Sequence, residues 1–156
     1  MIQRRAVANQ TMHSVQITQN DLTRMLGYNL KRAYMALHTD FRATVEQFGL
    51  TQRTFSLLSI VCENPDASQS DVSRSLGIER SGAVVIVDEL ERRGLIRRAP
   101  VPGDRRAHAL RATQDGQDIY DRALGAVIQH EASMLGDFSE TEIDKLRGLL
   151  ARIHNV

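Results

Sequence analysis

The chain has 156 residues, of which 42% are hydrophobic and only 4% are aromatic. This length and composition suit one domain with an aliphatic core, or one domain with additional helices. The formal net charge of +1 excludes a strongly basic protein of the histone type, so any affinity for nucleic acid has to come from local clusters of charge.

Cysteine usage and hydropathy indicate a soluble protein of a reducing compartment. Cys62 is the only cysteine, so the chain cannot form an internal disulfide. No apolar run approaches the ~20 residues that a membrane-spanning helix needs. The two arginines near the start are not followed by the apolar segment of a secretory signal. We therefore expect a cytoplasmic protein that makes no membrane contact.

The chain changes character at about residue 20. Residues 1–19 are polar and lack sustained periodicity, which predicts a mobile tail. From Asp21 to Phe48 apolar residues recur at intervals of three and four, the pattern of a long amphipathic helix. Asn20 or Asp21 can cap its start, and Gly49 can end it. Because so long a helix cannot bury its whole apolar stripe against a small domain of its own, the pattern indicates a second subunit.

Two shorter helices are predicted next. Thr51 is placed to cap the first, which stops near Asn64 because the residue before a proline is driven away from the α region. Ser68 begins the second, with Asp71 as the acidic partner of a capping box, and Gly77 ends it. Together with the helix that follows, this short helix gives a helix-turn-helix, an arrangement in which the second helix enters the major groove of DNA.

The helix predicted over Glu79–Arg93 has two different faces. Apolar residues at helical spacing form the side directed to the core: Ala83, Ile86, Val87 and Leu90. The residues that alternate with them face outward: Arg80, Ser81, Val84 and Asp88. Gly94 tolerates the left-handed conformation that ends a helix. This helix therefore presents one free face.

A two-stranded hairpin is predicted directly after this helix, with strands Leu95–Arg98 and Ala107–Ala112. The segment between them is turn-prone and holds Pro100, Pro102 and Gly103. The hairpin tip is charged and carries Asp104, Arg105 and Arg106. The minor groove of DNA is narrow and strongly negative, so it attracts an inserted arginine. The alternative is a solvated charged turn, but the position directly after an exposed helix favours DNA.

Two further amphipathic helices are predicted, over Gln114–Gly136 and from Ser139 onward. With the first long helix they could join two copies into a dimer. The sequence thus predicts a helical dimerisation region at 20–48 and 114–156 and a winged helix-turn-helix DNA-binding domain at 50–113. The expected fold is mainly α with a small β-hairpin wing.

This order of segments resembles the MarR (multiple antibiotic resistance regulator) family of dimeric repressors, over about Leu22–Ile153. The most specific matches are the run Asp88–Ile96 and the Asp-x-Arg motif at Asp104–Arg106, followed by Leu110 and Thr113. The resemblance implies a homodimeric transcriptional regulator of the winged helix-turn-helix class, a repressor that binds a pseudo-palindromic operator in double-stranded DNA.

Carried over position by position, the resemblance implies that Glu79–Arg93 is the recognition helix. The positions that match groove-facing ones are Arg80, Ser81, Gly82, Val84 and Val85. Asp104 and Arg106 match the Asp-x-Arg of the wing, with Arg106 in the minor groove and Arg105 on a phosphate. The glycine and the valines replace the polar or basic residues common in such helices. We therefore expect valine methyls to meet thymine methyls, with Arg80 as the main polar reader.

Members of this family commonly release DNA when a small molecule, often an aromatic acid or its coenzyme A thioester, acts near the junction of the dimerisation and DNA-binding parts. Tyr34, His38 and Arg42 lie four residues apart beside the apolar face of the first helix. They offer a donor, a titratable ring and a cation to a carboxylate or phosphate. Tyr120 is a further candidate wall of this site. The alternative is a solvated shoulder of the helix.

The sequence gives less support to three other functions. Cys62 suggests an oxidant-responsive repressor, but Glu63 beside it would raise the thiol pKa, which favours a structural buried thiol. A dimeric helical interaction module without DNA binding is a second alternative. No nucleophile–base pairing, phosphate loop or metal-ligand spacing among the five histidines supports an enzyme, a metal site or a cofactor.

Overall fold

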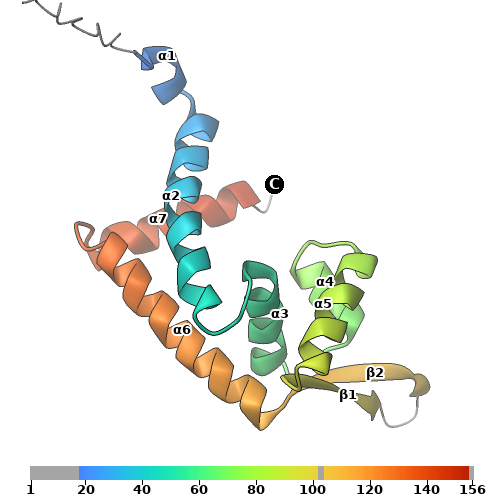
Figure 1. Cartoon of the computed structure of the whole chain (residues 1–156). Helices are drawn as coiled ribbons and strands as arrows, with labels where there is room; N and C mark the ends of the chain where they lie inside the picture. Colours follow the sequence, from blue (N-terminus) through green and yellow to red (C-terminus); the bar gives the residue numbers. More distant parts are fainter. Residues whose placement is uncertain (1–17, 102–103, 155–156) are drawn as a thin grey trace, which may run out of the picture. The chain divides into compact units, whose positions relative to one another are not determined.

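The computed structural model describes residues 18–101 and 104–154, with side chains for these residues except 101, 104–108 and 154 (Figure 1). Most of the predicted tail, residues 1–17, and the predicted turn residues Pro102 and Gly103 lie outside the described residues. The chain divides into two compact units, Met1–Tyr34 and Met35–Val156, and each is considered by itself.

The first unit contains α1 (Asn20–Thr23) and the beginning of α2 (Leu26–Glu46). The prediction of one continuous helix over Asp21–Phe48 is therefore wrong, because the chain leaves the helical path between α1 and α2. The predicted N-cap is also wrong, whereas Gly49, predicted to end the long helix, follows α2 with a left-handed φ of 68°. Gln19 occupies the N-cap position and makes no side-chain cap hydrogen bond, whereas Asn20 and Asp21 lie inside α1.

Asn29 gives the physical reason for this interruption. Its side-chain amide donates to the carbonyl oxygen of Thr23 at 2.7 Å and to that of Met25 at 3.0 Å. A side chain that satisfies backbone carbonyls offers the chain an alternative to the regular helical hydrogen bonds. The apolar spacing of the sequence does not reveal this competition.

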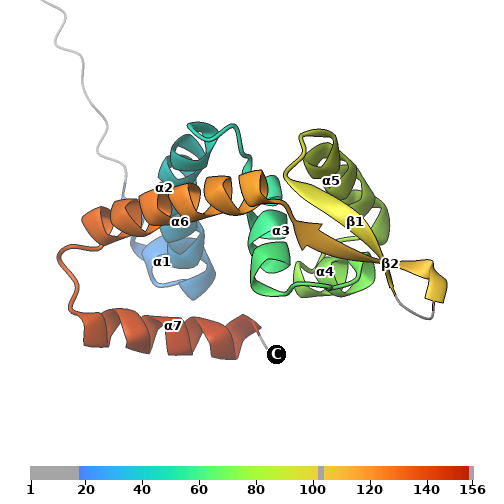
Figure 2. The same cartoon turned by 90° about the horizontal axis from the view of Figure 1, so that it is seen from below.

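The second unit begins within α2 and continues through a helix-turn-helix, a wing and the two C-terminal helices. Its remaining helices are α3 (Gln52–Glu63), α4 (Gln69–Ser75), α5 (Arg80–Arg92), α6 (Gln114–Met134) and α7 (Glu140–His154). α3 packs against α4, α5 and α6, and α6 starts directly after the wing (Figure 2). These elements confirm the predicted mainly helical fold with a small hairpin.

Side-chain caps fix the starts of α3 and α4, as predicted. The Thr51 hydroxyl accepts from the Thr54 N–H at 3.2 Å, and the Thr54 hydroxyl accepts from the Thr51 N–H at 2.8 Å. Ser68 and Asp71 form the same reciprocal pair at the start of α4. Hydrogen bonds from the hydroxyl and backbone N–H of Ser68 hold the pKa of the Asp71 carboxyl below its ordinary value. Each reciprocal pair satisfies two backbone donors that a helix start leaves open.

The last two helices also begin at the predicted caps. The Thr113 hydroxyl accepts from the Gly116 N–H at 3.0 Å at the start of α6. Before α7, the Ser139 N–H donates to the Glu142 carboxylate at 2.9 Å. α6 ends two residues earlier than the predicted end at Gly136, which lies in a turn.

The wing consists of β1 (Ile96–Val101) and β2 (Asp104–Ala112), paired antiparallel. Each strand is longer than predicted. Pro100, predicted in the turn, lies opposite His108 in the ladder. A proline is tolerated there because β1 is an edge strand, where a missing N–H removes no necessary hydrogen bond. Gly94 has a φ of 71°, which confirms the predicted left-handed end of α5.

β2 is also tied to the segment that precedes α4. Ser68 forms an isolated bridge with Ala109, and the Leu110 N–H donates to the Ala67 carbonyl at 2.9 Å. In return the Asp66 N–H donates to the Leu110 carbonyl at 3.2 Å. The wing is therefore anchored to the helix-turn-helix along a backbone edge as well as through α5.

The core of the second unit is aliphatic, as the composition predicts. Its fully buried large side chains come from every element of the helix-turn-helix and from the wing: Leu50, Leu57, Leu58, Val61, Val72, Val87, Leu90, Ile96 and Leu110. The predicted inward face of α5 is confirmed, since Ala83 and Val87 are fully buried and Ile86 is nearly so. Burying this face fixes which residues α5 turns outward.

The C-terminal helix leaves apolar side chains uncovered in the single chain. Four of them on α7 are 40% to 51% exposed: Leu146, Leu149, Leu150 and Ile153. Exposed apolar surface of this extent on neighbouring turns marks an interaction face. Within the described ranges no helix is both long and apolar enough to cross a membrane.

Candidate nucleic-acid interface and effector site

The outer face of α5 gathers the predicted groove-facing residues on one side of the helix. All of them are exposed: Arg80, Ser81, Gly82, Val84 and Val85. Val85 is 67% exposed, and a Cβ at Gly82 would meet no atom within 4 Å. This side of α5 is therefore open to a partner. It presents two valine side chains, one hydroxyl and one guanidinium.

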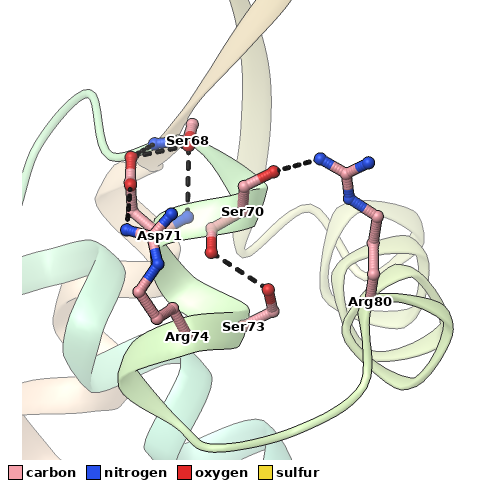
Figure 3. A network of polar contacts seen from close by, with 6 residues as sticks. All are labelled: Ser68, Ser70, Asp71, Ser73, Arg74 and Arg80. Carbon is pink, nitrogen blue, oxygen red and sulfur yellow. Dashed lines mark hydrogen bonds and ion pairs between the residues drawn. The ribbon is translucent and has the colours of Figure 1, made fainter.

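The guanidinium of Arg80 is held by α4. Its Nη2 donates to the Ser70 hydroxyl oxygen at 2.5 Å, a contact between residues ten positions apart (Figure 3). Arg80 is the first residue of α5, and Ser70 lies in the first turn of α4. Ser70 was not predicted as a functional residue, since local spacing carries no signal for a contact across the turn of a helix-turn-helix.

Asp88, predicted to face outward, lies beside a cation of the wing. Arg98 of β1 donates from Nη2 to the Asp88 carboxylate at 2.5 Å and from Nη1 to the Glu91 carboxylate. The hydrogen bond to Asp88 is the main cause of a raised Arg98 pKa. The single charge of Arg98 is shared by two carboxylates near the exposed face of α5, so it offsets part of their negative charge, and it ties the wing to that helix.

A second arginine of the wing is paired with the loop between α3 and α4. Arg111 of β2 donates to the Asp66 carboxylate from Nε at 2.5 Å and from Nη2 at 2.9 Å, a two-bond fork. This guanidinium lowers the pKa of the Asp66 carboxyl. Asp66 itself has a φ of 72°, a left-handed conformation that Asp adopts more readily than most residues. Asp66 and Arg111 thus help to fix the direction of the wing.

The predicted groove contacts of the wing tip are described only in their backbone. β2 begins at Asp104, whose backbone is paired with Val101, and it contains Arg105 and Arg106. The side chains of Asp104, Arg105 and Arg106 lie outside the described residues. Their contacts with DNA therefore stay predictions.

A hollow of about 330 Å³ brings together two of the predicted effector residues. Its lining comes from the second half of α2 and the start of α3: His38, Arg42, Glu46, Thr51, Gln52 and Arg53. Arg42 donates from Nε to the Glu46 carboxylate at 2.7 Å, and Arg53 adds a second guanidinium. One imidazole and two guanidiniums against one carboxylate suit an anionic group. We call this space the charged hollow.

The two tyrosines predicted for the effector site are placed differently. Tyr34 is 55% exposed and belongs to the first unit, so its part in a ligand site stays a prediction. Tyr120 is only 5% exposed and packs near Phe55. Its hydroxyl donates to the Glu63 carboxylate at 2.8 Å and lies 3.2 Å from the Ser59 hydroxyl. Both the ring and the hydroxyl of Tyr120 therefore make contacts that hold α6 against α3. We do not include Tyr120 among the residues proposed to bind an effector.

A second hollow, of about 260 Å³, has mostly apolar walls. Leu37 and Phe41 of α2 face the following residues of α6 across it: Val127, His130, Glu131 and Met134. The His130 Nε2 atom is buried, has no hydrogen-bond partner among the described residues and lies 3.8 Å from the Asp40 carboxylate. We call this space the apolar hollow. The sequence gives little indication of the apolar hollow, because the residues of its two walls are about ninety positions apart along the chain.

The environment of Cys62 argues against oxidant sensing. Burial, together with the carboxylates of Asp121 and Glu63, raises the thiol pKa to about 11. The thiolate is the form that reacts with peroxides, so only a very small fraction of this thiol is reactive near neutral pH. Cys62 also packs against the hydrophobic core. These features favour the structural role over the redox role.

The helix-turn-helix, the exposed outer face of α5 and the anchored hairpin define a winged helix-turn-helix regulator of transcription. A sequence model described as the MarR family matches residues 48–107. The putative transcriptional regulatory protein for the hcr operon of Thauera aromatica is 32% identical over 130 residues, which cover 83% of this chain and 78% of that protein. The chain belongs to the MarR family.

Solved structures agree with this assignment. The transcriptional repressor CouR bound to a 23-mer DNA duplex is 35% identical, with a TM-score of 0.84 over 90% of this chain and 99% of that chain. CouR from Rhodococcus jostii RHA1 bound to p-coumaroyl-CoA is 29% identical, with a TM-score of 0.78 over 85% of this chain and 93% of that chain. Relatives of this kind are regulators rather than enzymes.

Proposed function

We propose that the protein is a homodimeric repressor that acts in the cytoplasm and binds a pseudo-palindromic operator. A small aromatic acid or its coenzyme A thioester releases it from DNA. One observation carries the DNA half of this proposal: the open outer face of α5 lies beside a wing that is held to it through Arg98. A rigid helix next to a hairpin can enter the major groove while the wing follows the backbone into the minor groove.

The placement of charged side chains also supports DNA binding by α5 and the wing. Two wing arginines, Arg98 and Arg111, are paired with carboxylates. The Asp88 carboxylate, which would repel phosphate, is partly compensated by Arg98, which it shares with Glu91. The face that remains combines small and apolar groups with Arg80, which suits contacts with thymine methyls and one polar base edge.

The uncovered apolar residues of α7 support the dimer. A two-fold dimer presents two recognition helices, so its operator should consist of two inverted half-sites about one helical turn, roughly 34–36 Å, apart. A protein-interaction module with the same apolar faces would have no reason to prefer such a spacing.

We expect purified protein to enrich an inverted repeat from a library of randomised duplexes, with half-site centres about 10 base pairs apart. The measurement is sequencing of the bound fraction after several rounds of selection at moderate salt. Binding that shows no sequence enrichment and disappears as salt rises would be generic attraction to phosphate, and it would favour the interaction module instead.

The effector half of the proposal draws on the two hollows. CouR, a relative of similar fold, has been solved with p-coumaroyl-CoA. In this chain the charged hollow offers Arg42, Arg53 and His38 to a carboxylate or phosphate. The apolar hollow offers Phe41 and aliphatic walls to an aromatic ring. Both hollows touch the second half of α2, so a ligand there could change the presentation of the DNA-binding elements.

The Arg42→Ala variant is expected to need about five to ten times more effector to release DNA, since it removes one charge-assisted hydrogen bond to the anionic group of the ligand. Its affinity for DNA without effector should be unchanged. The measurement is displacement of a labelled operator by a hydroxylated aromatic acid and by its coenzyme A thioester.

Arg147→Ala is the matched control for this variant. Arg147 and Arg42 each have a 67% exposed side chain and an ion pair within their own helix, but Arg147 lies on α7. The control should release DNA at the wild-type effector concentration. An equal shift in both variants, or none in Arg42→Ala, would remove the charged hollow from the effector site.

A further inference from the structure

We propose that Ser70 is a specificity-determining residue, which positions Arg80 to read a guanine in the major groove. This inference rests on the proposed DNA-binding function and adds to it a residue outside the recognition helix. Ser70 lies on α4, so the base preference of α5 would be set partly by the neighbouring helix.

The geometry starts with the short hydrogen bond between the two helices. Arg80 Nη2 donates to the Ser70 hydroxyl oxygen at 2.5 Å (Figure 3). A free arginine side chain samples many rotamers, and ordering such a side chain on binding costs roughly 0.5–1.5 kcal/mol. A hydrogen bond formed before binding removes part of this cost. It also restricts the direction in which the guanidinium points.

Ser70 can perform this role because its own position is fixed. α4 starts at a reciprocal cap between Ser68, its N-cap residue, and Asp71, the third residue of its first turn. The carbonyl oxygen of Ser70 accepts from the hydroxyl of Ser73 at 3.0 Å, and Ser73 is only 8% exposed. Figure 3 shows the Ser68–Asp71 cap beside the contacts that join Ser70 to Ser73 and to Arg80. The acceptor is therefore built into the helix.

The remaining donors of Arg80 define what it can read. The bond to Ser70 uses one N–H of Nη2 and leaves the second N–H of Nη2 and those of Nη1 available. These donors form a fork that matches the O6 and N7 acceptors of guanine, the commonest specific contact of arginine in the major groove. Adenine offers a donor in place of O6 and cannot accept both bonds.

Within the first two turns of α5, Arg80 is the only exposed side chain that is both long and polar, whereas Arg92, which is also exposed, lies in the last turn. The neighbouring exposed positions carry short or apolar side chains: Ser81, Gly82, Val84 and Val85. A change in the pose of Arg80 should therefore appear as a change in preference at one base pair. It should not appear as a general loss of binding.

The test compares wild-type protein with Ser70→Ala in selection from the randomised library. It then compares the Kd of each protein for the selected duplex and for duplexes that replace one base pair at a time. We expect Ser70→Ala to lose preference for a single G·C pair per half-site by roughly three- to tenfold, the range that the ordering of one side chain allows. Preferences at all other positions and the melting temperature should stay at wild-type values.

Further variants separate the positioning of Arg80 from other roles of Ser70. Ser70→Thr keeps the hydroxyl and should restore the preference. Arg80→Ala and the double variant should have equal profiles, because Ser70 then has nothing to position. Ser75→Ala, another serine of α4 with an exposed side chain, is the matched control and should behave as wild type.

The outcomes distinguish this inference from the proposed function. If the wild-type protein enriches no sequence, the DNA-binding proposal itself fails. If the wild type enriches an operator and Ser70→Ala keeps the same base preferences, the operator proposal stands and the role of Ser70 is overturned. Uniform weakening on every duplex would likewise overturn it, because that result would mean a phosphate contact.

Discussion

Arg106→Ala is expected to weaken binding to the selected operator by about 30-fold or more. A positioned arginine in a groove contributes about 1–3 kcal/mol, and a dimer inserts two of them. The side chain of Arg106 lies outside the described residues, so the expectation rests on its place in β2 and on the Asp-x-Arg motif. The measurement is fluorescence anisotropy with labelled operator, alongside gel filtration and a melting curve.

The dimer and the melting temperature should be nearly unchanged in this variant. Arg105→Ala is the matched control, because a phosphate contact should weaken all duplexes alike and reduce the salt dependence of binding. A large fall in melting temperature for Arg106→Ala would mean that the arginine is architectural. Wild-type affinity would mean that the wing does not enter the minor groove.

Gly116→Ala is expected to destabilise the fold by about 3 kcal/mol or more, which corresponds to a melting temperature about 6–12 °C lower for a chain of this size. A Cβ on Gly116 would lie 1.9 Å from the carbonyl oxygen of Leu95 and 2.8 Å from its carbonyl carbon. Both are backbone atoms, so no side-chain rotation can relieve the overlap. The start of α6 or the turn that follows α5 has to move.

The close approach of Gly116 to Leu95 joins the start of α6 to the end of α5 and the start of the wing. The Thr113 N–H donates to the Leu95 carbonyl at 3.0 Å, and the Thr113 hydroxyl donates to the Gly94 carbonyl at 2.6 Å. Displacing Leu95 would therefore disturb the cap of α6, the end of α5 and the start of β1 together. We expect Gly116→Ala to lose operator affinity in the fraction that remains folded.

Gly125→Ala is the matched control on α6. A Cβ on Gly125 would meet no atom within 4 Å, and the residue is exposed. Alanine is favoured over glycine in a helix by roughly 0.5–1 kcal/mol, so this variant should melt at or slightly above the wild-type temperature. Equal melting temperatures for the two variants would contradict the close packing of α6 on Leu95.

Local signals were sufficient to predict most of the fold. The caps at Thr51, Ser68 and Thr113 and the left-handed Gly94 are set by neighbouring residues, and the structure confirms each of them. The inward face of α5 could be predicted because helical spacing assigns each apolar residue to a side. Membership of the MarR family, expected from these motifs, is confirmed.

What could not be predicted depends on contacts between distant residues or on competing side chains. The break between α1 and α2 arises from the Asn29 amide, which apolar spacing does not register. The pairing of Arg111 with Asp66 joins residues 45 positions apart. The sequence therefore indicated that the wing is rich in arginine, but it could not indicate which arginines are already paired.

The two candidate sites also differ in how far they can be predicted from the sequence. The exposed outer face of α5 could be predicted because one helix carries all of its residues. The proposed effector site draws on α2, α3 and α6, so the sequence predicts His38 and Arg42 for it but does not indicate Arg53 or His130, which the structure places beside the same hollows. Tyr120, predicted as a further wall of this site, is nearly buried and its hydroxyl donates to Glu63, a contact that the sequence does not show.

The most direct test of ligand-responsive repression is an anisotropy titration of purified protein against the DNA that flanks its own gene, with a scrambled duplex beside it. Hydroxylated aromatic acids and their coenzyme A thioesters are then added as competitors. We predict preferential binding to the flanking DNA and its reversal by one compound of this panel. Equal and weak binding to both duplexes, lost at moderate salt, would contradict the account.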